Sequence, residues 1–318
     1  MKEKNHSKYI LIILILSLNF FYSYLFYKIP GTIIISFIIL VPVAFYQLKY
    51  GIDGILNFSM IVLTICIYMI YGAITGISYT LLVIVPSIIV GVLLKQKLEF
   101  SKKISILSMV YFICFFSVIV IMNNLYNIDI VTIYFEGIDI VNNQFIEVYR
   151  NYIFDKTNSK ESILVIQGLK DFFHSMKYYY PALLYISCAI ISLIYIIIAE
   201  MILSRFKLFE FNTKSIMKFK VSRKMIVFLI CIFIFRAISY NDSYIKIAID
   251  NLLIILMCVL FFVGLLFEIF MIKMAKNNGQ KVLRIIVSIF CLIFFQSYFV
   301  FVGFIDGIFQ IKNKLLKV

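Results

Sequence analysis

The sequence predicts an all-α integral membrane protein, a polytopic helical bundle with about nine spans. Of its 318 residues, 63% are hydrophobic and only 14% are charged. A soluble domain carries roughly 45–50% apolar and about 25% charged residues, so this chain has more apolar surface than one water-facing globule hides. The apolar residues form long stretches, and basic residues gather between them. Together these features predict helices that cross a lipid bilayer.

A span needs about 20 consecutive apolar residues, and eight to ten stretches approach that length. The nine expected spans are Tyr9–Tyr27, Gly31–Gln47, Gly54–Tyr71, Ile77–Leu94, Ile104–Met122, Tyr179–Leu203, Met225–Tyr240, Ile245–Ile272 and Val282–Phe304. The first is long enough to span and no small-residue cleavage site follows it, so we expect an uncleaved helix. Pro42 and Pro86 are expected to bend the second and fourth spans.

Basic residues predict the orientation, because loops on the cytoplasmic side are rich in Lys and Arg. The amino-terminal segment, Lys49, the loop Lys95–Lys103, the loop Ser204–Lys224 and the turn Lys273–Arg284 hold 19 of the 30 basic residues. The sequence therefore predicts a cytoplasmic amino terminus. Nine spans place the carboxyl terminus outside, whereas Lys312, Lys314 and Lys317 favour the cytoplasm, so either the tail is an exception or one span is miscounted or re-entrant.

One long segment, Asn123–Lys177, does not span. It holds seven of the sixteen acids and five basic residues, as expected outside the cell. Apolar residues recur in it at steps of three and four, which predicts one amphipathic helix from Ile130 to Tyr152 and a second from about Ser162 to Met176. We favour helices that lie in the membrane interface over a lid on an outward-facing cavity. The predicted organisation is a five-span half at residues 1–122, this segment at 123–178, and a membrane half at 179–318.

Polar residues inside apolar stretches are the candidate substrate-binding groups, because each is costly in hydrocarbon. These candidates are Asn19, Asn57, Arg236, Asp250 and Asn251. Arg236 and Asp250 are expected to pair across a hairpin, and we favour a structural clip over a cavity lining. Glu268 has two interpretations, a proton- or ion-coupling group or a partner of Lys273 or Arg284 near the interface, and we favour the second. Glu200 is expected to lie at the interface near Arg205.

Enzymatic chemistry is not expected. The two histidines, His6 and His174, have no carboxylate or cysteine at a catalytic spacing, and the sequence has no phosphate-binding GxxxxGK[ST] loop. The six cysteines all lie in apolar stretches without a CxxC pair, so we expect neither disulfides nor a metal site. No catalytic residue and no cofactor is predicted. Basic residues lie in short runs between apolar stretches, which argues against nucleic-acid binding. The absence of Trp and the excess of Ile, Lys, Asn, Phe and Tyr are typical of an AT-rich genome, so we expect a bacterial plasma membrane.

Several short motifs resemble a known bacterial family. They are Val41-Pro-Val-Ala-Phe-Tyr-Gln-Leu-Lys-Tyr-Gly51 with Gly54, Tyr71-Gly72-Ala-Ile-Thr-Gly76, Val85-Pro86-Ser-Ile-Ile-Val-Gly91, Tyr180-Pro181, and Gly303-Phe-Ile-Asp306-Gly-Ile-Phe. In these the chain resembles the uncharacterised YybS-like membrane proteins over most of its length. The prolines and glycines named here, together with Pro42 and Gly51, are expected to serve turns and close helix packing. The Gly72 and Gly76 pair is expected at a turn and not at a dimer face.

The first half also resembles the substrate-binding S components of energy-coupling-factor (ECF) transporters. The resemblance lies in a Pro-led second helix, the Leu48-x-Tyr50-Gly51 turn and a further glycine on the next helix. It implies a six-span bundle with a pocket opening outward, and separate ATPase and coupling subunits as partners. Two departures are the bulky first helix, Ile10–Phe26, which lacks small residues four apart, and the three spans after the sixth.

These observations give three functional expectations. The first is a transporter, or its substrate-capture subunit, that takes up an unknown small molecule. The second is a non-transporting scaffold or regulator of cell-envelope or division machinery, in which the loop Arg205–Lys224 docks a partner or anionic lipid. The third and least favoured is a membrane enzyme.

Overall fold

The computed structural model describes residues 2–96, 98–153, 159–208, 216–217, 219, 221–238, 243–275 and 277–315. Every regular element in these ranges is helical. The helices are α1 (Lys2–Lys28), η1 (Pro30–Ile35), α2 (Phe37–Tyr50), α3 (Gly54–Tyr71), α4 (Ala73–Tyr79), η2 (Thr80–Ile84), α5 (Val85–Lys95), α6 (Phe100–Tyr126), α7 (Ile130–Ile153), α8 (Ser159–Tyr178), α9 (Tyr180–Arg205), α11 (Arg223–Ile238), α12 (Ser243–Met274), α13 (Asn278–Phe294), α14 (Gln296–Phe309) and α15 (Ile311–Leu315). The predicted all-α class is confirmed.

Seven helical segments of the described chain are long and apolar enough to cross a membrane, and a bent pair raises the number to eight. The first six and the eighth of the nine expected spans are among the seven. The expected seventh span corresponds to α11, whose 16 residues are shorter than the other spans. The expected ninth, Val282–Phe304, is not one straight helix, because α13 and α14 meet at Phe295 with a bend of 113°.

Two spans have irregular backbone. The second begins as the 3₁₀ helix η1 and continues as α2, with Pro42 inside it. The fourth contains the π-helical turn η2 between α4 and α5, directly before Pro86. A proline removes one backbone hydrogen bond and a π turn inserts an extra residue, so both spans have a local break. These two spans run side by side through the contact of α2 with α5.

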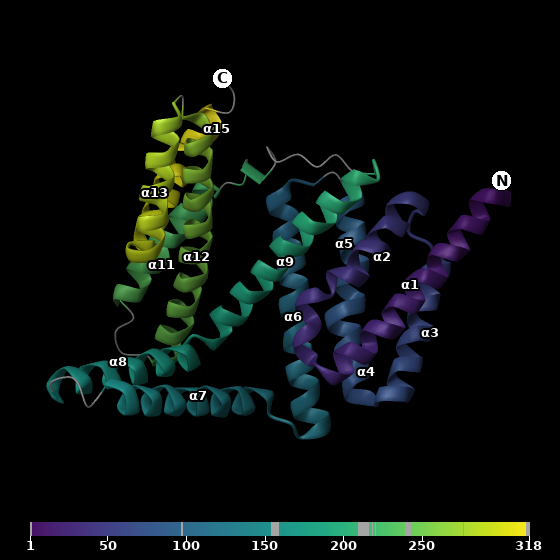
Figure 1. Cartoon of the computed structure of the whole chain (residues 1–318), viewed down its shortest axis with the longest axis horizontal. Helices are drawn as coiled ribbons and strands as arrows, with labels where there is room; N and C mark the ends of the chain where they lie inside the picture. The colour runs from purple at the N-terminus through teal and green to yellow at the C-terminus, as the bar shows by residue number, and fades with distance from the viewer. Residues whose placement is uncertain are drawn as a thin grey trace.

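The helices pack as two groups joined by α9 (Figure 1). α1 to α6 share two buried clusters, and the second of these also includes α9 residues such as Tyr195 and Ala199. α11, α12 and α14 share a third cluster around Leu256 and Val263. α9 runs obliquely from α8 to the far end of α2 and α6, and it contacts α2, α6 and α12. Large apolar side chains on the outer faces, such as Phe58 and Met69, remain exposed where a bilayer would solvate them.

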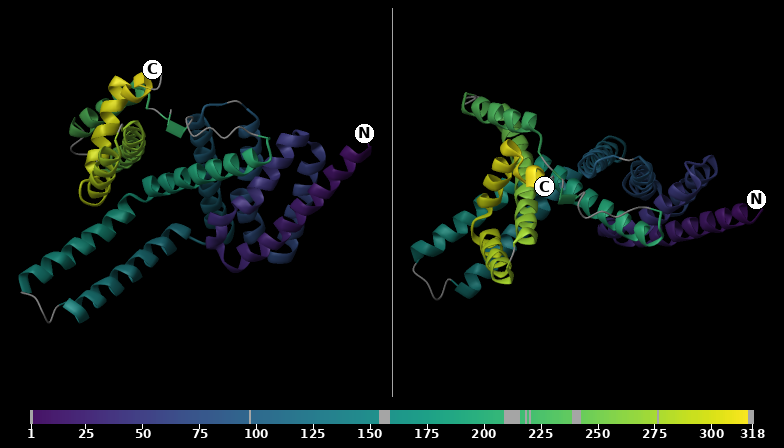
Figure 2. Two further views of the ribbon diagram at one scale, coloured as in Figure 1. Left: turned by 45° about the horizontal axis from the view of Figure 1, so that its top comes forward. Right: turned by 90° about the horizontal axis from the view of Figure 1, so that it is seen from above.

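The expected amphipathic helices are α7 and α8. They form a hairpin that lies across the ends of the spans, at the edge of the molecule away from both termini (Figures 1 and 2). Lys177 pairs with Asp139 at 2.6 Å, and the rings of Phe145 and Phe173 are 5.9 Å apart. Tyr134 and Val141 stay exposed on α7. This orientation agrees with the favoured interpretation, in which both helices lie along the membrane surface.

The side on which the carboxyl terminus lies is left open by the sequence. In Figure 1, α15 lies toward the same end of the molecule as the start of α1, away from α7 and α8. The bend at Phe295 makes the last apolar stretch either a broken span or a re-entrant pair. The fully buried Lys312 then donates from Nζ to the carbonyl of Phe219 at 2.7 Å, which ties α15 to the segment between α9 and α11. Lys312 and Lys314 therefore lie on the side where the other basic segments lie, and Lys317 is outside the described residues.

Candidate functional site

A line of buried polar groups follows α2 from one end of the bundle to the other. It begins at Ser36, the residue before α2, continues at Gln47 and ends in the turn at Asp53. Ser36 and Gln47 are each about 1% exposed. At 1.5 Å per residue the two lie roughly 16 Å apart, about half of a bilayer core. We call these groups and their partners the α2 polar line.

The first part of the line is a hydroxyl cluster of Tyr22, Ser36, Tyr111 and Tyr195. The Ser36 and Tyr195 hydroxyls are 2.6 Å apart. Tyr195 donates to the carbonyl of Ile33, and Tyr22 donates to the carbonyl of Thr32. Four helices, α1, α2, α6 and α9, thus meet around η1, whose 3₁₀ geometry leaves carbonyls available to side chains.

The Asn19 side chain, a predicted binding group, lies next to this cluster. Its Nδ2 donates to the carbonyl of Ile15 at 2.9 Å, and its Oδ1 accepts from the Tyr79 hydroxyl at 3.0 Å. Tyr79 is the last residue before the π turn η2, and its ring lies 6.1 Å from that of Tyr22. Asn19 therefore fixes the break in the fourth span against α1.

Two groups on the line have unmet hydrogen-bonding capacity. Among the described residues, both amide atoms of Gln47 are buried without a hydrogen-bond partner. The Tyr111 hydroxyl lies beside those of Ser36 and Tyr195, and its ring is 5.8 Å from that of Tyr195, but it makes no hydrogen bond of good geometry. Such groups are costly in an apolar interior. Gly91 makes room for the Gln47 side chain, because a Cβ at this position would lie 1.9 Å from Oε1 of Gln47. The line can therefore offer one hydroxyl and one amide to a ligand.

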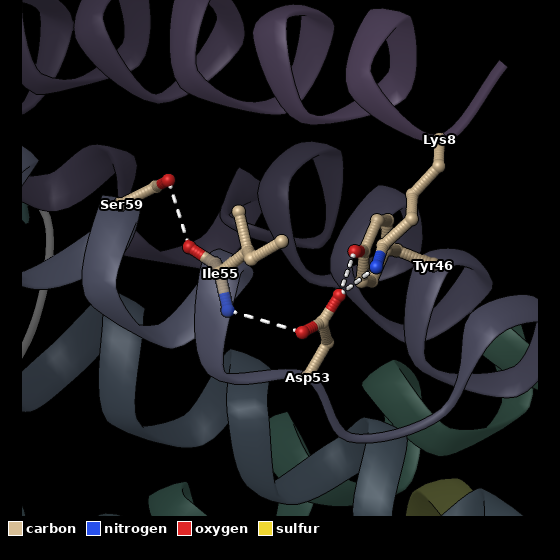
Figure 3. Close-up of polar contacts among 5 residues, drawn as sticks. All are labelled: Lys8, Tyr46, Asp53, Ile55 and Ser59. Carbon is tan, nitrogen blue, oxygen red and sulfur yellow. Dashed lines mark hydrogen bonds and ion pairs between the residues drawn. The ribbon is translucent and has the colours of Figure 1, made fainter. Parts of the chain in front are cut away.

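The line ends in the Asp53 cluster, made of Lys8, Tyr46 and Asp53 (Figure 3). Oδ2 of Asp53 accepts from the Tyr46 hydroxyl at 2.8 Å and forms an ion pair with the Lys8 ammonium. Oδ1 accepts from the backbone N–H of Ile55 at 3.1 Å and caps α3. The Lys8 ammonium, followed by the Ile55 N–H and the Tyr46 hydroxyl, lowers the pKa of Asp53 to about 2. The cluster closes this end of the bundle by holding the start of α1 against the α2–α3 turn.

The expected Arg236 and Asp250 pair is present. Nε of Arg236 binds Oδ1 of Asp250, and Nη2 lies 3.4 Å from Oδ2. The Arg236 side chain is 44% exposed, whereas that of Asp250 is 9% exposed. This geometry is that of a clip between α11 and α12, far from the α2 polar line.

Asn251 has a separate structural contact. Its Oδ1 accepts from the backbone N–H of Ala182 at 2.9 Å, and its Nδ2 donates to the carbonyls of Ile247 and Tyr178. Pro181 lies in the first turn of α9, where backbone donors have no partner within the helix. Asn251 on α12 thus caps the first turn of α9.

Asn57 is half-buried on α3, and its Oδ1 has no hydrogen-bond partner among the described residues.

Two of the motif glycines end helices. Gly51 has φ +89° and Gly72 has φ +85°, values that favour glycine, and they follow α2 and α3. A Cβ on Gly76 would lie 2.9 Å from the Tyr68 Cα, so this glycine permits close contact of α3 with α4. Gly54, the first residue of α3, has open space around it.

Sequence reasoning missed several of these groups. Glu200, expected at the interface near Arg205, is buried and pairs with Lys103 of α6 at 2.8 Å. The basic run Lys95–Lys103 predicts a loop, whereas Lys103 lies in the first turn of α6. The tyrosines of the hydroxyl cluster resemble ordinary interfacial aromatics in the sequence. The Asp53-Gly54 dipeptide, a helix N-cap signal between two apolar stretches, was the available clue to the Asp53 cluster.

In a comparison with known protein families, a family model described as "Predicted membrane protein (DUF2232)" matches residues 9–307. No curated protein and no solved structure matches the chain.

Proposed function

The chain belongs to the DUF2232 family of predicted membrane proteins, and from this premise we propose that it binds a small polar solute within the membrane and serves its uptake. The observation that carries the proposal is the pair of unpartnered groups, the Tyr111 hydroxyl and the Gln47 amide, on one line through the first six spans. Buried polar groups in a membrane protein are expensive and mark solute pathways.

Broken helices support the same proposal. In transporters, irregular backbone at membrane depth occurs where helices line a binding site or cavity. Here η1 begins the second span and η2 interrupts the fourth, and both lie beside the hydroxyl cluster. The irregular backbone and the unpartnered side chains lie in the same part of the bundle, which favours a binding site over a purely structural role.

The chemistry of the line suggests the class of solute. The groups from Ser36 to Gln47 are hydroxyls and one amide, which donate and accept hydrogen bonds without carrying charge. The charged residues are at its end, where Lys8 and Asp53 neutralise each other. An uncharged solute with several hydroxyl, amide or ring-nitrogen groups fits this lining best.

A solute can enter or leave only if the side chains that close the two ends of the α2 polar line move apart. Tyr22, Tyr79, Tyr111 and Tyr195 are at most 1% exposed and close it at one end. The Asp53 cluster closes the other end. The protein has no phosphate-binding loop of its own, so in the S-component interpretation separate ATPase and coupling subunits drive opening. The proposal includes three further statements. Both termini are cytoplasmic, the membrane is a bacterial plasma membrane, and the protein itself catalyses no reaction.

The alternative is a scaffold that does not transport. It depends on the basic loop between α9 and α11, of which Lys214, Lys218 and Lys220 are outside the described residues. Arg223 and Lys224 open α11 and are exposed. This alternative makes no use of the unpartnered groups in the first six spans.

One experiment distinguishes solute uptake from the scaffold function. The protein is purified in gentle detergent, and mass spectrometry identifies the bound small molecules and the co-purifying proteins. Uptake predicts one recurrent polar metabolite, with or without an ATPase pair and its coupling subunit. Envelope or division proteins without any metabolite would contradict the proposal and favour the scaffold.

A further inference from the structure

An open groove runs along the outer face of the first bundle, between α1 and α3. These two helices lie side by side at the edge of the molecule opposite α13 (Figure 1). The α1–α3 groove has a volume of about 610 Å³, within the range of about 300–1,000 Å³ that is usual for ligand pockets. Its lining is mainly apolar and aromatic, with Leu16, Phe20, Phe21 and Tyr24 from α1 and Leu63 and Tyr71 from α3.

The groove extends over the depth of one membrane leaflet. The buried Leu63 lies in the middle of α3, and Tyr71 is the last residue of that helix. At 1.5 Å per residue the two lie roughly 12 Å apart along the helix axis, and half of a bilayer core is about 15 Å. Phe20 and Phe21 are exposed on the α1 side of the groove. A groove of this length and lining fits one acyl chain of a lipid.

A cation lies at the end of the groove. The Lys28 ammonium is 6.0 Å from the ring centre of Tyr24, which lines the groove, and 5.4 Å from that of Tyr27. Tyr27 in turn stacks on Tyr71, the groove residue of α3, with ring centres 5.2 Å apart. Lys28 is exposed and forms no ion pair within the described ranges, whereas Lys177, on the same side of the molecule, pairs with an aspartate.

Membrane topology does not explain Lys28. Basic residues gather on the cytoplasmic side, and Lys28 ends α1 at the side opposite the amino terminus. A lysine at a helix C terminus interacts favourably with the helix dipole, but this interaction needs neither the groove nor the tyrosine rings. Tyrosine is enriched at the level of lipid headgroups, so the three tyrosines place the Lys28 charge where a headgroup lies.

We propose that the α1–α3 groove binds one anionic phospholipid from the leaflet on the α7–α8 side, with an acyl chain in the groove and the headgroup phosphate at Lys28. The ammonium attracts the phosphate as a point charge, and the hydroxyls of Tyr24 and Tyr71 can donate hydrogen bonds beside it. A zwitterionic phospholipid has the same acyl chains but carries its own ammonium, so it gains less from Lys28. This inference does not depend on solute uptake.

Tryptophan fluorescence tests the headgroup preference. The chain has no tryptophan, so Phe20→Trp places a single fluorophore in the groove. The full-length protein is reconstituted in mixtures of phosphatidylglycerol, which is anionic, and phosphatidylethanolamine, which is zwitterionic, with one of the two brominated on its acyl chains to quench the tryptophan on contact. Phosphatidylglycerol is expected to bind about fivefold more tightly, the effect of one lysine near a membrane surface. Lys28→Gln should abolish this preference, whereas Lys246→Gln, at an exposed lysine of α12 on the same side, should keep it.

A substitution inside the groove tests the place of the acyl chain. Ser17 also lines the groove and is exposed, so Ser17→Phe fills the groove and should weaken quenching by both lipids. Ser187→Phe, at an exposed serine of α9, is the matched control and should leave quenching unchanged.

Three results would overturn the proposal. Equal quenching by the two lipids, with or without Lys28→Gln, overturns the headgroup site. Quenching that Ser17→Phe does not change overturns the acyl-chain site. Weak quenching by both lipids in the Phe20→Trp protein, as when a second copy of the chain covers the groove, overturns lipid binding altogether. Should Ser17→Phe fail to fold, the comparison of Lys28→Gln with Lys246→Gln decides alone.

Discussion

Lys8 of α1 forms an ion pair with Asp53, the residue that caps α3, so one carboxylate joins the amino-terminal helix to the α2–α3 turn. Tyr46 completes the contact from α2. Helices α1 and α2 and the start of α3 therefore meet at one end of the α2 polar line.

Asp53 has two roles that substitutions can separate. Asp53→Asn retains a good N-cap and loses the ion pair, so it should cost about 0.5–1 kcal/mol of unfolding free energy. Asp53→Ala loses both and should cost about 1–2 kcal/mol. Denaturation in detergent measures the difference. Equal losses in both variants would show that the ion pair with Lys8 carries all the stabilisation.

The Asp53 cluster should withstand acid. A carboxyl whose pKa is lowered from 3.8 to about 2 stabilises the fold above pH 4, and that contribution is lost as the pH falls from about 4 to 2. Between pH 5 and 8, therefore, the stability difference between wild type and Asp53→Asn should stay constant. A difference that shrinks within this interval would contradict the proposed pairing.

The glycine contact between α12 and α14 should be intolerant of any side chain. Gly264→Ala and Gly303→Ala place a Cβ about 2 Å from a carbonyl oxygen, so each should cost about 3 kcal/mol or more. Gly137→Ala is the matched control, because this helical position of α7 has open space and should gain about 0.5–1 kcal/mol. Thermal unfolding of the three variants measures this, and an unaffected Gly303→Ala would contradict the close packing.

The buried pair of Lys103 and Glu200 should show strong coupling. Glu200→Gln leaves a buried ammonium without its counter-ion and should cost about 3–5 kcal/mol. The double variant Lys103→Met/Glu200→Leu removes both charges and should be more stable than either single variant. A double-mutant cycle measures the coupling, and simple additivity would show that the two side chains do not interact.

Both termini should lie on the cytoplasmic side. The bend at Phe295 and the contact of Lys312 with Phe219 place the tail beside the basic segments. Reporter fusions after residue 318 and before residue 1 should therefore give the same cytoplasmic signal. Opposite signals would mean that the bent pair crosses the membrane.

The sequence predicted the spans well, because apolar length and basic loops follow directly from solvation in a bilayer. The lysines of the tail indicated that one span was miscounted or re-entrant, but the sequence could not place the turn at Phe295, since Val282–Phe304 is as apolar as a true span. The sequence also could not reveal ion pairs between residues that lie far apart in the chain. Lys103 and Glu200 lie in different spans, 97 residues apart in the chain. The pair of Arg236 and Asp250 could be predicted because only four residues separate their helices.

The most direct test of the uptake proposal compares solute occupancy in matched variants by native mass spectrometry. Wild type and Tyr68→Phe, a change at a half-exposed tyrosine of α3, should retain the same polar metabolite. Tyr111→Phe and Gln47→Leu remove the unpartnered hydroxyl and amide. Both variants should lose most of the bound metabolite, because each lost hydrogen bond weakens its binding by about 1–3 kcal/mol. If wild type holds no metabolite, or if all four proteins hold the same amount, the α2 polar line is not a binding site.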